Sequence, residues 1–250
     1  MIGGRLLALM EQLGGMSVLA ARMVWGLVTL RADRTEFWRN MYRVGVKSFP
    51  VVAVTAVLVG AITVIQTGQV VAEFGATSLV GWGTSFATLR EIGPILIGLM
   101  FSGRVGANNT AELGTMVVTE QVDALRALAI NPIDFLLAPR YLAIIIMMFM
   151  LTIIGNLMAL LAAAGTAYVL LGVDMRLYYA SFAELIELWD FFSGIIKAVG
   201  FGSAIALVSC YFGINTSGGA VGVGRAVNSA VVASAVSIFV LDFLLSAMLP

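Results

Sequence analysis

The chain has 250 residues, of which 60% are apolar and only 11% are charged, and its mean hydropathy is +1.02. A soluble domain carries roughly 25% charged residues, so this composition excludes the soluble classes and predicts a membrane protein. The net charge is +0 and histidine is absent, which disfavours nucleic-acid binding, histidine metal centres and histidine acid–base catalysis. A single cysteine, Cys210, excludes an intrachain disulfide.

The segment 1–47 predicts an amphipathic helical region in the membrane interface rather than a span. Its apolar stretches are short and broken by charge, which is also atypical of a cleaved signal peptide. Basic residues then follow in quick succession at Arg31, Arg34, Arg39, Arg43 and Lys47. Such a pattern favours arginines that face lipid headgroups.

Five later segments are long and apolar enough to cross a bilayer. We expect spanning helices within 48–72, 74–103, 141–173, 198–224 and 226–250. Pro50 would open the first span, and Asp242 lies inside the fifth. Residues 172–197 mix acidic and aromatic side chains, which predicts an amphipathic helix at the membrane surface. The predicted fold class is therefore all-α integral membrane, with one domain over residues 1–250 and a five-helix bundle over 48–250.

Basic residues set the predicted orientation. Seven of the fourteen precede Ser48, and alternation of five spans places Arg104, Arg126, Arg140 and Arg225 on the same side. The positive-inside rule then puts the N-terminus in the cytoplasm, and the C-terminus and the 172–197 segment outside.

Small residues recur at every fourth position of several spans, as at Gly155, Ala159, Ala163 and Ala167. This spacing lets helix backbones approach closely in lipid. Chance in a chain rich in glycine and alanine is the competing explanation.

Two adjacent charges, Arg90 and Glu91, interrupt the second predicted span. Charges inside a span are costly and seldom face lipid, so each needs a partner, a wet cavity or a polar ligand. One interpretation is an ion pair that ties two helices together, and the other is a polar spot in a substrate cavity. Both hold if the cavity lies at a helix or subunit interface.

The stretch 112–140 lies on the predicted cytoplasmic side. Residues 116–130 have apolar residues at helical spacing, with Glu120 and Asp123 largely away from that face. Asn131-Pro132 ends the predicted helix. This short amphipathic helix either caps the bundle or acts as a coupling helix that docks on a cytoplasmic motor.

The glycine-rich segment 216–225 lacks the Gly-Lys-Ser/Thr ending of a Walker A loop, and no Walker A motif occurs elsewhere in the chain. We expect it to be a turn that opens the fifth span. The sequence thus predicts no ATPase, no catalytic residue, no metal site and no bound cofactor. Any ATP hydrolysis must come from another polypeptide.

The order and spacing of several short motifs resemble the MlaE/YrbE permease family over nearly the whole chain from about residue 45. The motifs are Leu89-Arg90-Glu91-Ile92-Gly93-Pro94, Gly103-Arg104-Val105-Gly106, Ala111-Glu112-Leu113-Gly114-Thr115-Met116, Thr119-Glu120-Gln121-Val122-Asp123-Ala124-Leu125, Asn131-Pro132, Pro139-Arg140, Thr216-Ser217-Gly218-Gly219-Ala220 and Gly222-Val223-Gly224-Arg225-Ala226-Val227.

This resemblance implies the permease of a phospholipid-transport ABC system in the bacterial inner membrane. It implies a homodimer that works with a cytoplasmic ABC ATPase, a periplasmic MCE-domain lipid-binding protein and, in many systems, a STAS-domain protein. By the same resemblance, a lipid cavity would be lined by Gln66, Phe74, Arg90 and Glu91. The ATPase-coupling region would be 112–126, with Glu112, Glu120, Asp123, Leu125 and Arg126.

Two other classes compete with a lipid permease. A stand-alone secondary transporter or channel for a small apolar solute is expected to show repeated halves and several ionisable residues in the membrane. The chain shows no inverted repeat, and only Arg90, Glu91 and Asp242 are candidates for such residues. A membrane enzyme needs a nucleophile, an acid–base pair or metal ligands, and the sequence offers no such set.

Overall fold

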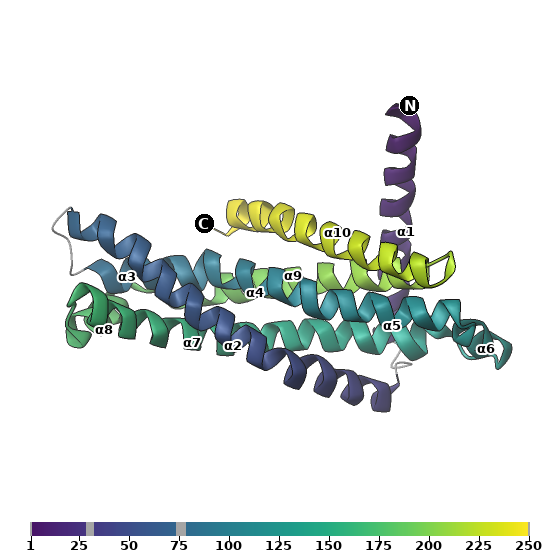
Figure 1. Ribbon diagram of the computed structural model, residues 1–250, viewed down its shortest axis with the longest axis horizontal. Helices are drawn as coiled ribbons and strands as arrows, with labels where there is room; N and C mark the ends of the chain where they lie inside the picture. The colour runs from purple at the N-terminus through teal and green to yellow at the C-terminus, as the bar shows by residue number, and fades with distance from the viewer. Residues whose placement is uncertain (1, 29–32, 74–78, 250) are drawn as a thin grey trace. The chain divides into compact units, whose positions relative to one another are not determined.

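The computed structural model describes residues 2–28, 33–73 and 79–249. Figure 1 shows a helical chain, and no strand occurs within these three ranges. The α-helices are α1 (Ile2–Val28), α2 (Arg34–Glu73), α3 (Val80–Ala87), α4 (Gly93–Phe101), α5 (Ala107–Val118), α6 (Gln121–Ala127), α7 (Ala138–Leu171), α8 (Met175–Leu185), α9 (Leu188–Ile214) and α10 (Gly219–Met248). Three π-helical turns, η2 (Thr88–Ile92), η3 (Ser102–Gly106) and η4 (Ile133–Leu137), lie at the joints of longer helical runs.

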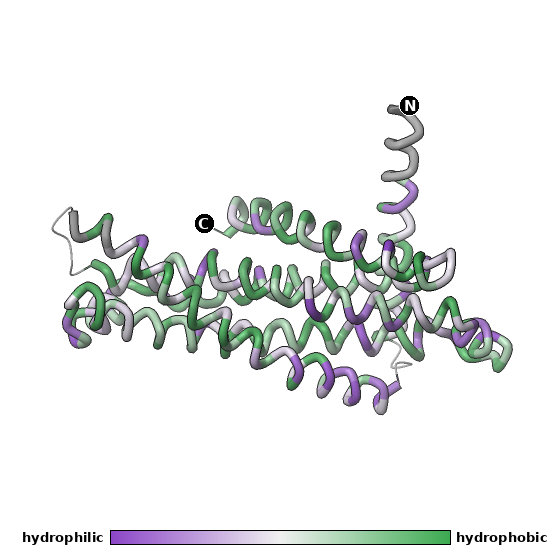
Figure 2. Tube along the Cα trace, in the orientation of Figure 1, coloured by the Kyte–Doolittle hydropathy of each residue, from purple (hydrophilic) through white to green (hydrophobic). Residues whose placement is uncertain are grey.

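Five helical runs among the described residues are long and apolar enough to cross a membrane. They are Arg34–Gly68, Val80–Val118, Ile133–Leu171, Leu188–Ile214 and Gly219–Met248. Figure 2 shows the contrast along α2, which is hydrophilic near its start and mostly apolar along its middle. The prediction of an all-α integral membrane protein with five spans is therefore confirmed.

The predicted start of the first span is wrong. Helix α2 begins at Arg34 and continues without a break through Pro50, which lies inside it. The arginine-rich residues therefore extend the spanning helix, because a helix satisfies its backbone hydrogen bonds whether it lies in lipid or in headgroups. Pro50 removes only one of these bonds.

The predicted surface helix over 172–197 is also wrong in its extent. Helix α8 ends at Leu185, where Ile186 turns to an extended backbone, and α9 begins at Leu188. Asp190 and Lys197 therefore belong to the fourth spanning run. Their charges indicated a surface segment, but ion pairs within the protein offset the cost of placing them in a span.

Contacts divide the chain into two compact units, each built from parts of several helices. Unit 1 comprises Met1–Gly45, Ser102–Met147 and Gly202–Ser237, and unit 2 comprises Val46–Phe101, Met148–Phe201 and Ile238–Pro250. In unit 1, α1 contributes Leu19 and Met23 to a core with Leu113, Leu136, Leu137 and Cys210. The segment around α1 therefore packs on the protein through one apolar face.

Unit 2 has its own core around Val64, Val80, Ala163, Ala164, Ala167, Val173 and Tyr178. Helices α3 and α8 lie side by side (Figure 1), and the Tyr178 hydroxyl lies 3.0 Å from the Thr84 hydroxyl. On α7, the predicted small-residue ridge is buried. A Cβ atom added to Gly60 would lie 2.0 Å from the carbonyl oxygen of Ala159. Only glycine allows α2 and α7 to pack this closely.

Candidate functional site

A buried lysine organises the charged cluster of unit 2. The Lys197 side chain on α9 is fully buried, and its Nζ lies 2.5 Å from Oε2 of Glu91 and 3.2 Å from Oδ1 of Asp242. It also donates a hydrogen bond of 2.7 Å to the Ser246 hydroxyl on α10. Lys197 therefore joins η2, α9 and α10 through one ammonium group.

Arg90 makes a separate set of contacts on the same unit. Its Nη1 lies 3.2 Å from Oδ1 of Asp190, and its Nη2 donates a 2.6 Å hydrogen bond to the carbonyl oxygen of Leu249. The guanidinium carbon also lies 5.4 Å from the centre of the Phe86 ring, within the range of a cation–π contact. Arg90 and Glu91 thus bind different partners although they are adjacent in the chain.

The local backbone explains how two adjacent charges reach different partners. Residues 88–92 form the π-helical turn η2, a wider turn that is frequently found at functional sites. Helix α9 comes close to this turn, because a Cβ atom on Gly194 would lie 2.0 Å from the carbonyl oxygen of Leu89. Glycine at this position brings Lys197, one turn further along α9, within reach of Glu91.

The cluster has three carboxylates and two cations, and it is only partly covered. Lys197 is inaccessible, whereas the side chains of Glu91, Asp242 and Arg90 are 36%, 17% and 16% exposed. Within the described residues, no group of acidic, histidine or cysteine side chains is placed to hold a metal ion. On its buried side the cluster can hold η2, α9 and α10 together. On its open side it can contact a polar group of a ligand.

Of the two other predicted cavity residues, only Gln66 lies among the described residues. Gln66 is exposed on α2, and among the described residues the polar contacts of the cluster come from η2, α9, α10 and Leu249 directly after α10. Phe74 lies outside the described residues. The lining of a lipid cavity by Gln66 and Phe74 therefore stays a prediction.

The second candidate region, 112–126, belongs to unit 1. The predicted single helix over 116–130 is wrong, because α5 ends at Val118 and α6 starts at Gln121. Glu120 adopts a left-handed backbone, with φ of 59°, and this conformation breaks the helix. Left-handed residues are uncommon outside glycine, asparagine and aspartate, so the sequence carried no usual signal for this break.

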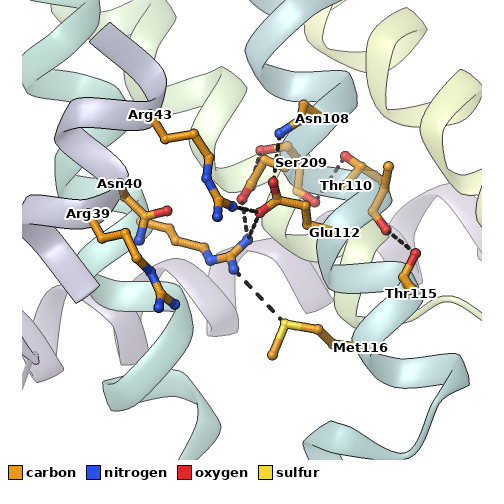
Figure 3. A network of polar contacts seen from close by, with 12 residues as sticks. Arg39, Asn40, Arg43, Asn108, Thr110, Glu112, Thr115, Met116 and Ser209 are labelled. Carbon is orange, nitrogen blue, oxygen red and sulfur yellow. Dashed lines mark hydrogen bonds and ion pairs between the residues drawn. The ribbon is translucent and has the colours of Figure 1, made fainter. Parts of the chain in front are cut away.

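The predicted coupling residues divide into an inner and an outer group. Glu112 on α5 binds Arg43 at 2.5 Å and Arg140 at 3.3 Å, in the network that Figure 3 shows. Glu120 is exposed, as are Asp123 and Arg126, which pair with each other at 2.9 Å. Leu125 packs against the core of unit 1. The short helix α6 therefore presents charged side chains outward and is held by an apolar residue.

Sequence reasoning missed the partners of the unit 2 cluster. Lys197, Asp190 and Ser246 were not recognised as intramembrane polar residues, although Asp242 was. The available signal was the high mean hydropathy of the segment 188–214, which persists in spite of the two charges at 190 and 197. A charge inside such a segment predicts an ion pair in the protein.

Comparisons with known proteins cover most of the chain. The family model described as Permease MlaE matches residues 37–248. A probable ABC transporter permease protein of Rickettsia typhi is 39% identical over 211 residues, which cover 84% of this chain and 82% of the relative. A probable ABC transporter permease protein of Synechocystis is 36% identical, with 86% and 82% covered. TRIGALACTOSYLDIACYLGLYCEROL 1, a chloroplastic protein of Arabidopsis thaliana, is 35% identical, with 91% and 67% covered.

Proposed function

Because the chain belongs to the MlaE family of ABC transporter permeases, we propose that its substrate is phospholipid. The protein would move lipid between the bacterial inner membrane and a periplasmic MCE-domain partner. The observation that carries this proposal is the partly open cluster at Arg90 and Glu91 within apolar spans. Fixed charges beside apolar helices suit a molecule with a polar headgroup and acyl chains.

The partners follow from the same reasoning. ATP would be hydrolysed by a separate cytoplasmic subunit, because the chain has no Walker A motif. The resemblance to the family implies a homodimer, and α10, of which only 11% of the most apolar window is buried within one chain, leaves a face for the second copy. Two copies would enclose a cleft between them, and a STAS-domain protein is a further candidate partner. Membership in a family of ABC permeases disfavours a stand-alone transporter.

Alanine substitutions test the lipid role of the cluster. Arg90→Ala and Glu91→Ala are expected to reduce ATP-driven lipid transfer between vesicles while the dimer and the ATPase contact persist. Each variant is purified with its partners, and subunit ratios are measured beside transfer rates. Loss of assembly in both variants would show instead that the pair is only a structural tie.

Photo-crosslinking tests the predicted cavity wall at Gln66. A crosslinker at 66 is expected to capture phospholipid to an extent that changes when ATP is added. Leu161 on α7 is a matched control in unit 2, because it is also exposed on an apolar span and would meet bulk lipid in every state. Equal behaviour at the two positions would remove Gln66 from the cavity.

Charge reversal tests the coupling role of α6. Asp123→Lys is expected to weaken co-purification of the ATPase, by about 2–5 kcal/mol if the carboxylate is buried at the interface. Glu184→Lys is the control, because Glu184 is an exposed carboxylate on α8, which is predicted to lie on the opposite side of the membrane. Parent-like co-purification of the Asp123 variant would refute the coupling role.

A further inference from the structure

Unit 1 has a hollow of about 450 Å³ whose wall carries three arginines. Arg39 and Arg43 come from α2 and Arg140 from α7, while α5 contributes Glu112 and Met116. Figure 3 shows Arg39, Arg43, Glu112 and Met116 turned toward a common space between their helices. The hollow is made of residues different from those of the charged cluster in unit 2.

Arg140 is the buried base of this hollow. Its side chain is only 5% exposed, and its Nη1 lies 3.2 Å from Oδ1 of Asn109 and 3.3 Å from Oε2 of Glu112. Its Nη2 lies 3.9 Å from Oε1 of Glu36 and 4.0 Å from the Met116 sulfur. Its Nε is buried and has no hydrogen-bond partner among the described residues. A buried guanidinium with an unused donor is an incompletely satisfied cation.

The carboxylates around the hollow do not balance its arginines. Glu36 binds Arg39 at 2.5 Å, and Glu112 binds both Arg43 and Arg140. Three guanidinium groups therefore face two carboxylates, which leaves one positive charge in excess. A ligand that completes this network must be an anion.

Two of the arginines are exposed and keep unused N–H donors that can reach such an anion. The Arg39 side chain is 64% exposed and the Arg43 side chain 35% exposed. Arg39 uses Nη2 and Arg43 uses Nη1 in its ion pair, whereas a guanidinium has five N–H donors in a fork that matches phosphate oxygens. The wall thus combines a fixed inner cation with two outer arginines of suitable geometry.

The depth of the hollow points to a lipid phosphate. On α2, the charge-free stretch begins at Ser48, so Arg43 lies roughly 7.5 Å before it along the axis. On α7, Arg140 directly precedes the charge-free stretch 141–173. The polar headgroup layer adds roughly 5–7 Å to each side of the hydrocarbon core. The two helices therefore place Arg43 and Arg140 near headgroup level, beside apolar Met116 and Leu136.

We propose that this hollow binds the phosphate of an anionic phospholipid headgroup in the leaflet on the arginine-rich side of the membrane. Gln121, the first residue of α6, also lines it. A bound headgroup would therefore contact the segment that we expect to meet the ATPase. The site senses lipid composition and does not depend on which substrate the transporter moves.

Native mass spectrometry of the full chain, purified in detergent with its partners, tests this site. Phosphatidylglycerol is titrated as the anionic probe, phosphatidylcholine as the zwitterionic comparison and inorganic phosphate as the free anion. The double variant Arg39→Gln/Arg43→Gln is expected to bind phosphatidylglycerol at least about tenfold more weakly, because it loses charge-assisted hydrogen bonds. Arg34→Gln is the control, since Arg34 is an exposed arginine on the same helix outside the hollow.

A second double variant separates a loss of lipid binding from a loss of folding. Arg39→Lys/Arg43→Lys keeps both charges beside Glu36 and Glu112 but loses the bidentate fork, so several-fold weaker binding is expected. Parent-like binding of phosphatidylglycerol by the two double variants overturns the proposal. If inorganic phosphate occupies the hollow as well as phosphatidylglycerol does, the proposal that the phosphate belongs to a lipid is overturned. If the variants lose the ATPase but still bind phosphatidylglycerol as the parent does, the arginines bind a carboxylate of the ATPase instead, and this result also overturns the proposal.

Discussion

Replacing Lys197 by methionine should be the most damaging single change in the charged cluster. The side chain is fully buried, and its ammonium serves Glu91 at 2.5 Å and Asp242 at 3.2 Å. Methionine keeps much of the volume but leaves two carboxylates without their cation. Removing one partner of a buried ion pair costs about 3–5 kcal/mol. We expect Lys197→Met to lower the free energy of unfolding by that amount.

Variants at the two acceptors should be milder, and their order follows from exposure. Glu91→Gln leaves Lys197 bound to Asp242 and Ser246, and the Glu91 side chain is 36% exposed. Its cost should therefore approach the roughly 1 kcal/mol of an ordinary hydrogen bond. Asp242→Asn should fall between the two, because Asp242 is 17% exposed.

Reversible unfolding in mixed micelles provides the assay, with helix content and a fluorescent probe as independent signals. The double variant Lys197→Met/Asp242→Asn is the control, since it removes the cation together with one stranded carboxylate. It should be more stable than Lys197→Met alone. Unchanged stability of Lys197→Met, or a larger loss for Glu91→Gln, would refute the central role of the lysine.

Three further predictions concern topology, packing and pH. Single cysteines at Leu185 and Ala220 should be labelled from opposite sides, the first from outside and the second only after permeabilisation; the reverse pattern would overturn the predicted orientation. Gly60→Ala should lower the free energy of unfolding by about 1–3 kcal/mol, because its Cβ would lie 2.0 Å from the carbonyl oxygen of Ala159. Gly165→Ala is the control, because its Cβ would have no neighbour within 4 Å, and it should change the free energy of unfolding little in the same assay. Burial raises the pKa of Tyr178 above its usual 10.0, so its contribution to stability should be lost as pH rises above 10.0, and Tyr178→Phe should flatten that part of the pH–stability curve.

Hydropathy was sufficient to predict five spans because lipid requires long apolar helices. The errors lie where charge was taken as a boundary. The arginines before Ser48 and the charges at Asp190 and Lys197 all continue a helix, because headgroups or ion pairs satisfy them. Local composition cannot reveal a partner that lies 106 residues away, as Glu91 does from Lys197.

The break at Glu120 illustrates a different limit. Sequence spacing predicted one helix over 116–130, and no glycine or proline lies between Thr119 and Ile130. The left-handed turn at Glu120 separates α5 from α6, and Val122 and Leu125 then pack inward. Tertiary contacts of two apolar residues decide the backbone here, which single-residue propensities do not describe.

The charged cluster of unit 2 holds α10 in place, because little of this helix is buried against the rest of the protein. Only 11% of its most apolar window is buried, compared with 56% for α9. Lipid covers apolar surfaces as well as protein does, so apolar packing alone gives such a helix little reason to stay in place. Asp242 and Ser246 bind Lys197, and the carbonyl oxygen of Leu249 accepts from Arg90. These polar contacts fix the end of α10 on η2 and α9. If the headgroup of the proposed substrate competes for Arg90, it would also weaken the hold on α10. Substrate binding would then be coupled to movement of this helix.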